Sequence, residues 1–347
     1  MERLKIQDLG PGRALSVRLD GRLYASRGYA VYESEDDGAT WSHRTSLPVG
    51  WKRQPGRFVR LAARLLRFEV RALAALADGS LVAANRDWVF HAKPGERRVQ
   101  ACNVDEAGQA LMPPFSITVG PDERVLFGEY NPKTGHGTAV RLYVSEDGGR
   151  SFEIGRVFEG GSIMHVHNVT WDAAGEHYWV FTGDYDDEPG IGILSADLAH
   201  FDWLVRGDQQ YRLCEAFDFG DRLIYATDTP LEPNAVMSID KASGRTERLI
   251  ETGGSCLYAC RFGGVYAFST TVESVSPDAD QSIGLWVSRD GDHWTSVLDA
   301  EKDRWHPNLF QFGSLILPRG PSEKETLFFS GQAVKRFDGR TFAGTLA

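Results

Sequence analysis

The stretch that decides the fold runs from Leu15 to Trp41 and reads LSVRLDGRLYASRGYAVYESEDDGATW. It contains two apolar strands joined by a tight Asp-Gly turn, then a third apolar strand, and an acidic turn that ends on a tryptophan. Short apolar runs bounded by Asp and Gly are typical of β-hairpins. One such unit cannot bury its apolar faces alone, so a stable fold requires the chain to repeat it.

The hairpin does recur along the whole chain. Seven copies share a turn that contains Gly or Asp, and these turns lie at Gly21, Gly79, Asp122, Gly175, Gly220, Gly263 and Gly313. Successive turns are 43 to 58 residues apart, and a third apolar strand and a weaker fourth follow each hairpin. Four strands per repeat at this period are the signature of a β-propeller. The sequence therefore predicts an all-β propeller of seven four-stranded antiparallel blades, or six if one repeat is misread.

The repeats predict a single β-propeller domain over residues 1–347. The longest interval contains a basic run, so residues 47–67 are interpreted as an insertion after the first blade. Its arginines are expected to be solvated, although they could collect an acidic ligand. The segment RLKIQDL at residues 3–9 is expected to supply a strand to the last repeat. Both termini would then close in one blade, which hides edge strands that otherwise invite aggregation.

Charge and hydropathy exclude some classes of function. The net charge of -10 argues against a nucleic-acid partner, because phosphate neutralisation requires clustered Lys and Arg. No apolar run is long enough to cross a bilayer. The N-terminus lacks the apolar core of a secretory signal, so a cytoplasmic protein is expected. The sequence does not indicate an oligomeric state.

The four cysteines agree with a reducing compartment. Cys256 and Cys260 lie four residues apart on an expected strand. That spacing places them roughly 13 Å apart, which is too far for a disulfide. Cys102 and Cys214 could pair, but nothing in the sequence requires it. Four reduced thiols are the prediction.

The acidic turn of the opening stretch has its own repeat. SEDDGATW at residues 34–41 returns as SEDGGRSF at 145–152, with partial copies at 195–203 and 288–294. These turns resemble the Asp box, or BNR repeat, of the sialidase-like and glycosyl hydrolase-like propeller proteins. The resemblance implies hairpins between the third and fourth strands of a blade, on the face away from the ligand. The residue types fit a hairpin clasp, because Asp accepts bonds from turn amides, Gly allows a positive φ, and the aromatic packs between sheets.

The rim opposite these turns is where a ligand is expected, at the mouth of the central channel. It should be built from the starts of first strands and the ends of second strands. Polar and ionisable residues gather at those positions: Arg71, Asn85, Arg86, Asp87, Glu129, Tyr130, His165, His167, Asp184, Tyr185, Asp186, Tyr211, Arg212, Asp228, His306, Asn308 and Gln311. We expect substrate to bind Arg71, Arg86, Tyr130, Asp186, Arg212, Asp228, His306 and Gln311.

The motif HVHN contains two candidate metal ligands. His165 and His167 alternate along an expected strand, so both side chains should lie on one face, roughly 7 Å apart. That spacing suits two ligands to one divalent metal, or a base beside a substrate-binding residue. His306 and either Asp184 or Asp186 could complete a metal site. Alternatively, one histidine binds backbone carbonyls and the other packs in the channel.

Carboxylates and arginines offer further chemistry. An acid/base pair for glycoside cleavage could come from Glu129, Asp184, Asp186, Glu215 and Asp228, which otherwise serve as turn formers. The sialidase resemblance implies that arginines bind a substrate carboxylate, with Arg71, Arg86, Arg212 and Arg261 as candidates. It also implies a nucleophilic Tyr/Glu pair, from Tyr130, Tyr185 or Tyr211 with Glu129 or Glu215. The Arg-Ile-Pro motif of that family is absent.

The predicted function is that of a carbohydrate-active enzyme on an acidic glycan, with His167, Glu129, Asp184 and Tyr211 as catalytic residues. The reaction expected first is hydrolysis. The chain is also similar to seven-bladed polysaccharide lyases, in which Arg neutralises a uronate and His or Tyr abstracts the C5 proton. By residue type, His165, His167, Tyr211, Arg212 and His306 fit those roles. A third alternative is a non-catalytic propeller that binds a glycan or a protein, similar to the Asp-box proteins of photosystem assembly.

Overall fold

The chain groups into two compact units in the computed structural model. The described residues are 3–102, 104–130, 137–273, 282–320 and 322–347. The first unit comprises Met1–Val70, Pro230–Val236 and Arg248–Ala347. The second unit comprises Arg71–Thr229 and Met237–Glu247.

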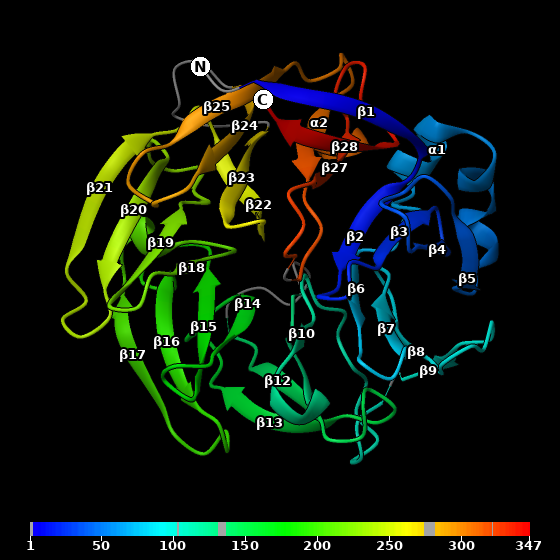
Figure 1. Cartoon of the computed structure of the whole chain (residues 1–347). Helices are drawn as coiled ribbons and strands as arrows, with labels where there is room; N and C mark the ends of the chain where they lie inside the picture. The colour runs from blue at the N-terminus through cyan, green and yellow to red at the C-terminus, as the bar shows by residue number, and fades with distance from the viewer. Residues whose placement is uncertain (1–2, 103, 131–136, 274–281, 321) are drawn as a thin grey trace. The chain divides into compact units, whose positions relative to one another are not determined.

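The second unit is built from antiparallel sheets of four strands, each in sequence order. One sheet contains β6 (Ala72–Ala75), β7 (Leu81–Ala84), β8 (Val89–Ala92) and β9 (Gln100–Ala101). The next contains β10 (Thr118–Val119), β11 (Val125–Gly128), β12 (Val140–Ser145) and β13 (Glu153–Phe158). A third contains β14 (His165–Asp172), β15 (His177–Gly183), β16 (Gly190–Ser195) and β17 (Phe201–Arg206) (Figure 1). The fourth begins in this unit and contains β18 (Phe217–Asp218), β19 (Arg222–Ala226), β20 (Ala235–Asp240) and β21 (Thr246–Glu251).

Inner strands are apolar on both faces because the sheets of this unit pack face to face. One core cluster joins Leu142 and Val144 of β12 to Val169 of β14 and Val180 of β15. Another joins β12, through Tyr143, to the β6–β9 sheet. The β10–β13 sheet is therefore covered on both sides, which explains why its inner strands are nearly continuous apolar runs. Outer strands such as β13 and β17 are half-exposed along most of their length.

The first unit contains one four-stranded sheet and one of eight strands among the residues described. The four-stranded sheet consists of β2 (Arg13–Val17), β3 (Leu23–Arg27), β4 (Ala30–Ser34) and β5 (Ser42–Ser46). The larger sheet consists of β1 (Leu4–Pro11), β22 (Ser255–Phe262), β23 (Val265–Val272), β24 (Ile283–Ser288), β25 (Thr295–Ala300), β26 (Gly313–Ile316), β27 (Leu327–Gln332) and β28 (Arg340–Leu346). β1 pairs with β28, so strands from both ends of the chain lie in one sheet.

Helical segments are short and few. The described ones are η1 (Trp51–Arg57), α1 (Arg60–Leu65), η2 (Pro121–Glu123), η3 (Gln209–Tyr211) and α2 (Pro307–Phe310).

η1 and α1 fall in the basic insertion. The expectation that its arginines are solvated is wrong for Arg64, which is 2% exposed and binds the Asp303 carboxylate and the Phe310 carbonyl oxygen. This side chain anchors the insertion because a buried guanidinium needs all its donors paired.

The acidic turns join third and fourth strands, between β4 and β5, β12 and β13, β16 and β17, and β24 and β25. In the first, Ser34 Oγ donates to Asp36 Oδ1 at 2.8 Å and accepts from the Gly38 amide at 2.8 Å. Asp36 Oδ1 also accepts from the Thr40 amide at 2.8 Å. The side chains of the motif thus close the turn by local hydrogen bonds.

The architecture confirms an all-β chain of four-stranded antiparallel sheets. β26 pairs with the end of β23 through Thr271 and Val272, which joins two runs of four strands into the eight-stranded sheet. The seven-blade count and the single-domain organisation therefore stay predictions. Among the described helices, none is long and apolar enough to cross a membrane. All four cysteines are free and buried.

Candidate functional site

Two buried histidines begin strand β14 in the second unit. His165 is 2% exposed and His167 is 1% exposed. The pairing of β14 with β15 shifts register between Val166 and Asn168, so His167 lies at the irregularity. The two rings are neighbours, with centroids 4.9 Å apart. The sequence prediction that both side chains share one site holds for their geometry.

Asp184 follows β15 and faces both imidazoles. Its Oδ1 atom lies 3.3 Å from His165 Nε2 and 3.2 Å from His167 Nε2. The same oxygen lies 2.8 Å from Arg212 Nη2. The Asp184 amide donates to Glu188 Oε2 at 2.8 Å, which fixes the backbone at this point. Three side chains, two from β14 and one from the segment after η3, thus converge on one carboxylate oxygen.

The hydrogen bonds of the histidines show which ring nitrogens are available. His167 Nδ1 lies 2.9 Å from the Leu213 carbonyl oxygen, which can only accept, so Nδ1 carries a hydrogen. His167 Nε2 is left to face Asp184. Neither ring nitrogen of His165 makes a hydrogen bond of standard geometry among the described residues, although Nε2 lies 3.3 Å from Asp184 Oδ1. Buried polar atoms are nearly always paired, so these nitrogens need a functional explanation.

The electrostatics keep Asp184 charged and His165 neutral. Burial alone would raise the pKa of Asp184, but His165, His167 and Arg212 outweigh it and hold that pKa well below its usual range. Burial lowers the pKa of His165 to about 4, against the opposing influence of Asp184. At neutral pH His165 is therefore an unprotonated imidazole, the form that accepts a proton or binds a metal.

A second carboxylate lies on the other side of Arg212. Asp228 Oδ2 is 3.9 Å from Arg212 Nε and accepts from Cys214 Sγ at 3.3 Å. Burial raises the pKa of Asp228, and Arg212 opposes that shift. The two carboxylates that flank Arg212 therefore have pKa values shifted in opposite directions.

An aromatic and a cation complete the surroundings of His165. The Tyr130 ring centroid lies 4.0 Å from that of His165. The Arg71 guanidinium carbon lies 4.5 Å from the Tyr130 centroid. Burial raises the pKa of Tyr130, so its phenol stays protonated at neutral pH. The surroundings of His165 therefore contain a hydroxyl donor and a guanidinium.

Other predicted residues lie outside this cluster. Glu129 is 5% exposed, and its oxygens accept from the Arg141 amide at 2.8 Å and from the Tyr143 hydroxyl at 3.0 Å. Tyr211 lies in η3, where burial raises its pKa. Arg86 and Asp186 are exposed on loops.

The remaining predicted residues belong to the first unit. His306 precedes α2 as its N-cap residue, and Arg261 lies in β22. Gln311 is 4% exposed and donates from Nε2 to Glu69 Oε2 at 2.6 Å. These residues lie outside the unit that contains the histidine cluster.

Three supporting residues were not predicted. Glu188 binds the Asp184 amide, and Gln209 donates from Nε2 to the Asp184 carbonyl at 3.0 Å. Cys214 forms a second group with His167 and Asp228, whose ligand atoms lie within 4.8 Å of one another. The run DYDDE marked the segment that contains Glu188, but no sequence pattern shows which of its carboxylates turns back toward the backbone.

Comparison with solved structures places the chain among β-propellers. An oligogalacturonate lyase in complex with manganese matches with a TM-score of 0.64 at 8% identity, covering 100% of this chain and 96% of the other. YCF48 from Cyanidioschyzon merolae matches with a TM-score of 0.57 at 12% identity, covering 98% of each chain. A chain of the mitotic checkpoint complex matches with a TM-score of 0.61 at 12% identity, covering 99% and 93%. No family model and no curated protein sequence matches.

These similarities establish the fold. One of these neighbours is named as a lyase and another belongs to a mitotic checkpoint complex, and a propeller serves many functions. Function therefore has to be argued from the cluster of His165, His167, Asp184, Arg212 and Asp228, which we call the histidine–aspartate cluster.

Proposed function

We propose that this chain is a carbohydrate-active enzyme that cleaves an acidic glycan by β-elimination at the histidine–aspartate cluster. The observation that carries the proposal is His165: it is 2% exposed, its lowered pKa keeps it neutral at pH 7, and its Nδ1 has no hydrogen-bond partner among the residues described, while its Nε2 faces Asp184 Oδ1 at 3.3 Å. A base for carbon acids needs a free nitrogen lone pair in a dry site. Core histidines that only pack are normally hydrogen-bonded.

The reaction needs three groups, and the cluster offers a candidate for each. His165 would take the proton from C5 of the uronate as the C4–O bond breaks and the C4–C5 double bond forms. Arg71 or Arg212 would bind the substrate carboxylate, whose negative charge grows as the proton leaves. Tyr130 would donate a proton to the departing oxygen, since its phenol is protonated. The lyase with a similar fold is named for an acidic oligosaccharide, which supports this choice of substrate class.

Glycoside hydrolysis is the second candidate, favoured by the two carboxylates beside Arg212. The pKa of Asp184 is lowered, so this carboxylate stays ionised as a nucleophile must. The pKa of Asp228 is raised, which favours the protonated form that a general acid needs. Glu129 is not part of this proposal, because both its oxygens already accept internal hydrogen bonds. The two reactions leave different products, which an assay distinguishes.

The cluster also fits a divalent metal. His165, His167 and Asp184 offer three ligand atoms within 4.8 Å of one another. The bond from His167 Nδ1 to a backbone carbonyl is the second-sphere contact that orients a metal-binding histidine through Nε2. A bound cation would supply positive charge next to the substrate carboxylate. His165 would then be a metal ligand and could not also act as the base.

We further infer that the four acidic turns are Asp boxes and that the propeller has seven blades. The turn at Ser145 supports the first inference, because Ser145 Oγ and Asp147 Oδ1 make the same pair of contacts as Ser34 and Asp36. The consecutive runs β22–β25 and β26–β28 with β1 support the second.

The test is to incubate the purified protein with oligogalacturonate and other uronate or sialate oligosaccharides. Elimination predicts new reducing ends together with an unsaturated product that absorbs in the ultraviolet. Hydrolysis predicts reducing ends without that absorbance. Wild type treated with a chelator, and then resupplied with Mn²⁺, shows whether a metal is needed. Cleavage of no acidic oligosaccharide under any of these conditions would contradict the enzyme proposal and favour a binding function.

A further inference from the structure

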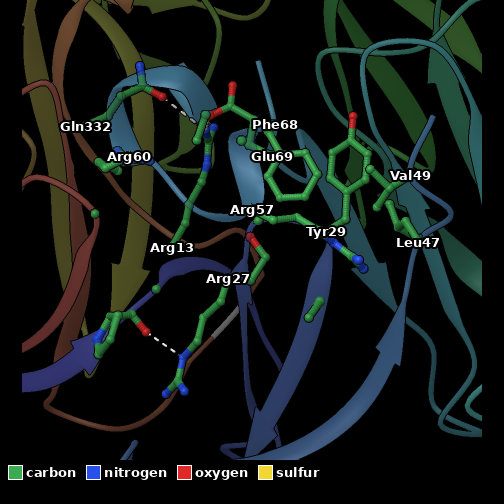
Figure 2. Close-up of a pocket in the computed structure, with 18 of the residues that line it drawn as sticks. Arg13, Arg27, Tyr29, Leu47, Val49, Arg57, Arg60, Phe68, Glu69 and Gln332 are labelled. Atoms are coloured by element: carbon green, nitrogen blue, oxygen red, sulfur yellow. Dashed lines mark hydrogen bonds and ion pairs between the residues drawn. The ribbon is translucent and has the colours of Figure 1, made fainter. Parts of the chain in front are cut away.

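A cavity of about 460 Å³ lies in the first unit, but two of the arginines in its wall are each engaged by the protein itself. Arg13 Nη1 lies 2.9 Å from Glu69 Oε2 and 3.0 Å from Gln332 Oε1 (Figure 2). Arg27 points away from these residues and donates from Nε to the Pro11 carbonyl at 2.7 Å. These charged side chains therefore do not converge on one ligand.

The second unit contains the convergence that this cavity lacks, in a group of three buried side chains. His167, Cys214 and Asp228 are 1%, 2% and 4% exposed, and their ligand atoms lie within 4.8 Å of one another. Cys214 Sγ lies 3.3 Å from Asp228 Oδ2. Ligand atoms around a tetrahedral zinc ion are about 3.5 Å apart, given the metal–ligand bond lengths. The thiol and the carboxylate are thus already at the spacing of two ligands to one ion.

Hydrogen bonds to the backbone hold the imidazole and the thiol in place. His167 Nδ1 donates to the Leu213 carbonyl at 2.9 Å, and Asn168 Nδ2 donates to the Cys214 carbonyl at 3.0 Å. The start of β14 is therefore tied to the segment that carries the cysteine. A histidine whose Nδ1 donates to a carbonyl is oriented to bind a metal through Nε2.

The charges of the group match a divalent cation. Metal ligands bind in their deprotonated forms, so Cys214 and Asp228 would together bring two negative charges. Arg212 lies beside the group, with Nε 3.9 Å from Asp228 Oδ2, but its Nη2 makes the shorter contact, 2.8 Å, with Asp184 Oδ1. Asp184 therefore balances the charge of Arg212 and leaves the thiolate and the second carboxylate to the cation.

We propose that His167, Cys214 and Asp228 form a second metal site, which takes a thiophilic divalent cation such as Zn²⁺. A thiolate ligand selects Zn²⁺ over Mg²⁺, Ca²⁺ and Mn²⁺, which prefer oxygen ligands. Three protein ligands leave the fourth tetrahedral position to water or to another small ligand. This goes beyond the proposed function, because it concerns a different class of metal and requires no glycan. Both metal sites need His167 Nε2, so a cation in one excludes a cation from the other.

Titration of the reduced protein with Co²⁺, a spectroscopic substitute for Zn²⁺, tests the proposal. A cobalt–thiolate bond gives a charge-transfer band in the near ultraviolet, which nitrogen and oxygen ligands alone do not give. Wild type should develop this band to saturation, and Zn²⁺ but not Mn²⁺ should remove it. Cys214→Ser, which nearly keeps the shape of the side chain, should abolish the band. Asp228→Asn should weaken Co²⁺ binding about ten-fold or more, because a charged ligand is lost.

Cys102→Ser is the matched control, because Cys102 is a buried cysteine of the same unit whose thiol donates to the Gly149 carbonyl at 3.4 Å. It should keep the band. His165→Gln should keep it too, which separates this site from the proposed enzyme activity and from the other metal site. Circular dichroism checks that each variant folds. No charge-transfer band in wild type, or a band that Cys214→Ser keeps, would overturn the proposal.

Discussion

The acidic turns and the histidine–aspartate cluster are both rich in carboxylates, yet they differ in how their polar atoms are paired. In the turn at Ser145, Asp147 accepts from the Arg150 and Ser151 amides at 2.9 and 3.0 Å, and every contact is local. In the cluster, both ring nitrogens of His165 are buried and make no hydrogen bond of standard geometry among the described residues. The polar side chains of the acidic turn, the motif that is easiest to see in the sequence, are thus engaged in closing a hairpin. The residues of the histidine–aspartate cluster come from separate segments of the chain.

The largest effect is expected at Asp184. Asp184→Asn keeps the shape of the side chain and removes the charge that His165, His167 and Arg212 face. We expect turnover of an acidic oligosaccharide to fall on the order of 100-fold or more, and the free energy of unfolding to fall by about 3 kcal/mol because a buried ion pair is broken. Initial rates and urea denaturation measure the two effects.

Asp202→Asn is the control for that substitution, because Asp202 is exposed in the outer strand β17 of the same sheet. It should leave both quantities unchanged. A folded Asp184→Asn variant with wild-type turnover would show that the cluster is a structural feature, as the acidic turns are.

The second effect is a dependence of stability on pH. The pKa of His165 is about 4 in the folded protein, below the ordinary value of roughly 6.5 that applies when the chain is unfolded. The unfolded chain therefore binds the proton first, and stability is lost as pH falls from about 6.5 to about 4. The full difference is on the order of 3 kcal/mol.

His165→Gln isolates this contribution from those of Asp184, His167, Arg212 and Tyr130, which face the same ring. Urea denaturation at pH 7, 5.5 and 4.5 should show a steeper loss for wild type than for the variant. If wild type and the variant lost stability in parallel as pH falls, His165 would be protonated or paired in the folded protein. The contrast between His165 and the paired carboxylates of the acidic turns would then be wrong.

The third effect is at the acidic turns. Asp147→Ala removes four hydrogen-bond acceptor contacts in a half-exposed turn, so the free energy of unfolding should fall by about 1 kcal/mol. Asp36→Ala should shift stability in the same direction. Any turnover or glycan binding should be retained, and lost binding in a well-folded variant would show that the turns contact the ligand.

The smallest effect is expected from reduction. All four cysteines are free and buried, so a reducing agent has no disulfide to break. The melting temperature should be the same with and without dithiothreitol. A clear decrease would reveal an intermolecular or rearranged disulfide.

The sequence predicted the sheets well because each is a local repeat. The predicted hairpin from Asn168 to Asp184 corresponds to β14 and β15, which end at Asp172 and Gly183, and the third strand AVYES is β4. Local turn chemistry and apolar runs are enough to define such units. The sequence left the number of blades open, and the pairing of β23 with β26 keeps it open.

The site was predicted in part for a similar reason. The sequence pointed to His165, His167, Asp184, Arg212 and Asp228 because each lies near a strand end of a repeat, and the structure brings these side chains together; that they form a functional site stays a prediction. The contact of Glu188 with the Asp184 amide could not be predicted, because it depends on how one loop turns back. The contact by which Arg64 anchors the insertion could not be predicted either, because no sequence pattern pairs Arg64 with Asp303 across 239 residues.

The central claim is that function lies where buried polar atoms lack partners and not in the conspicuous acidic motif. Turnover of an acidic oligosaccharide by His165→Gln and by Asp147→Ala, measured side by side on folded protein, tests it most directly. The account predicts that His165→Gln loses at least 100-fold in rate while Asp147→Ala keeps the wild-type rate. Equal rates in the two variants, or loss only in Asp147→Ala, would contradict it.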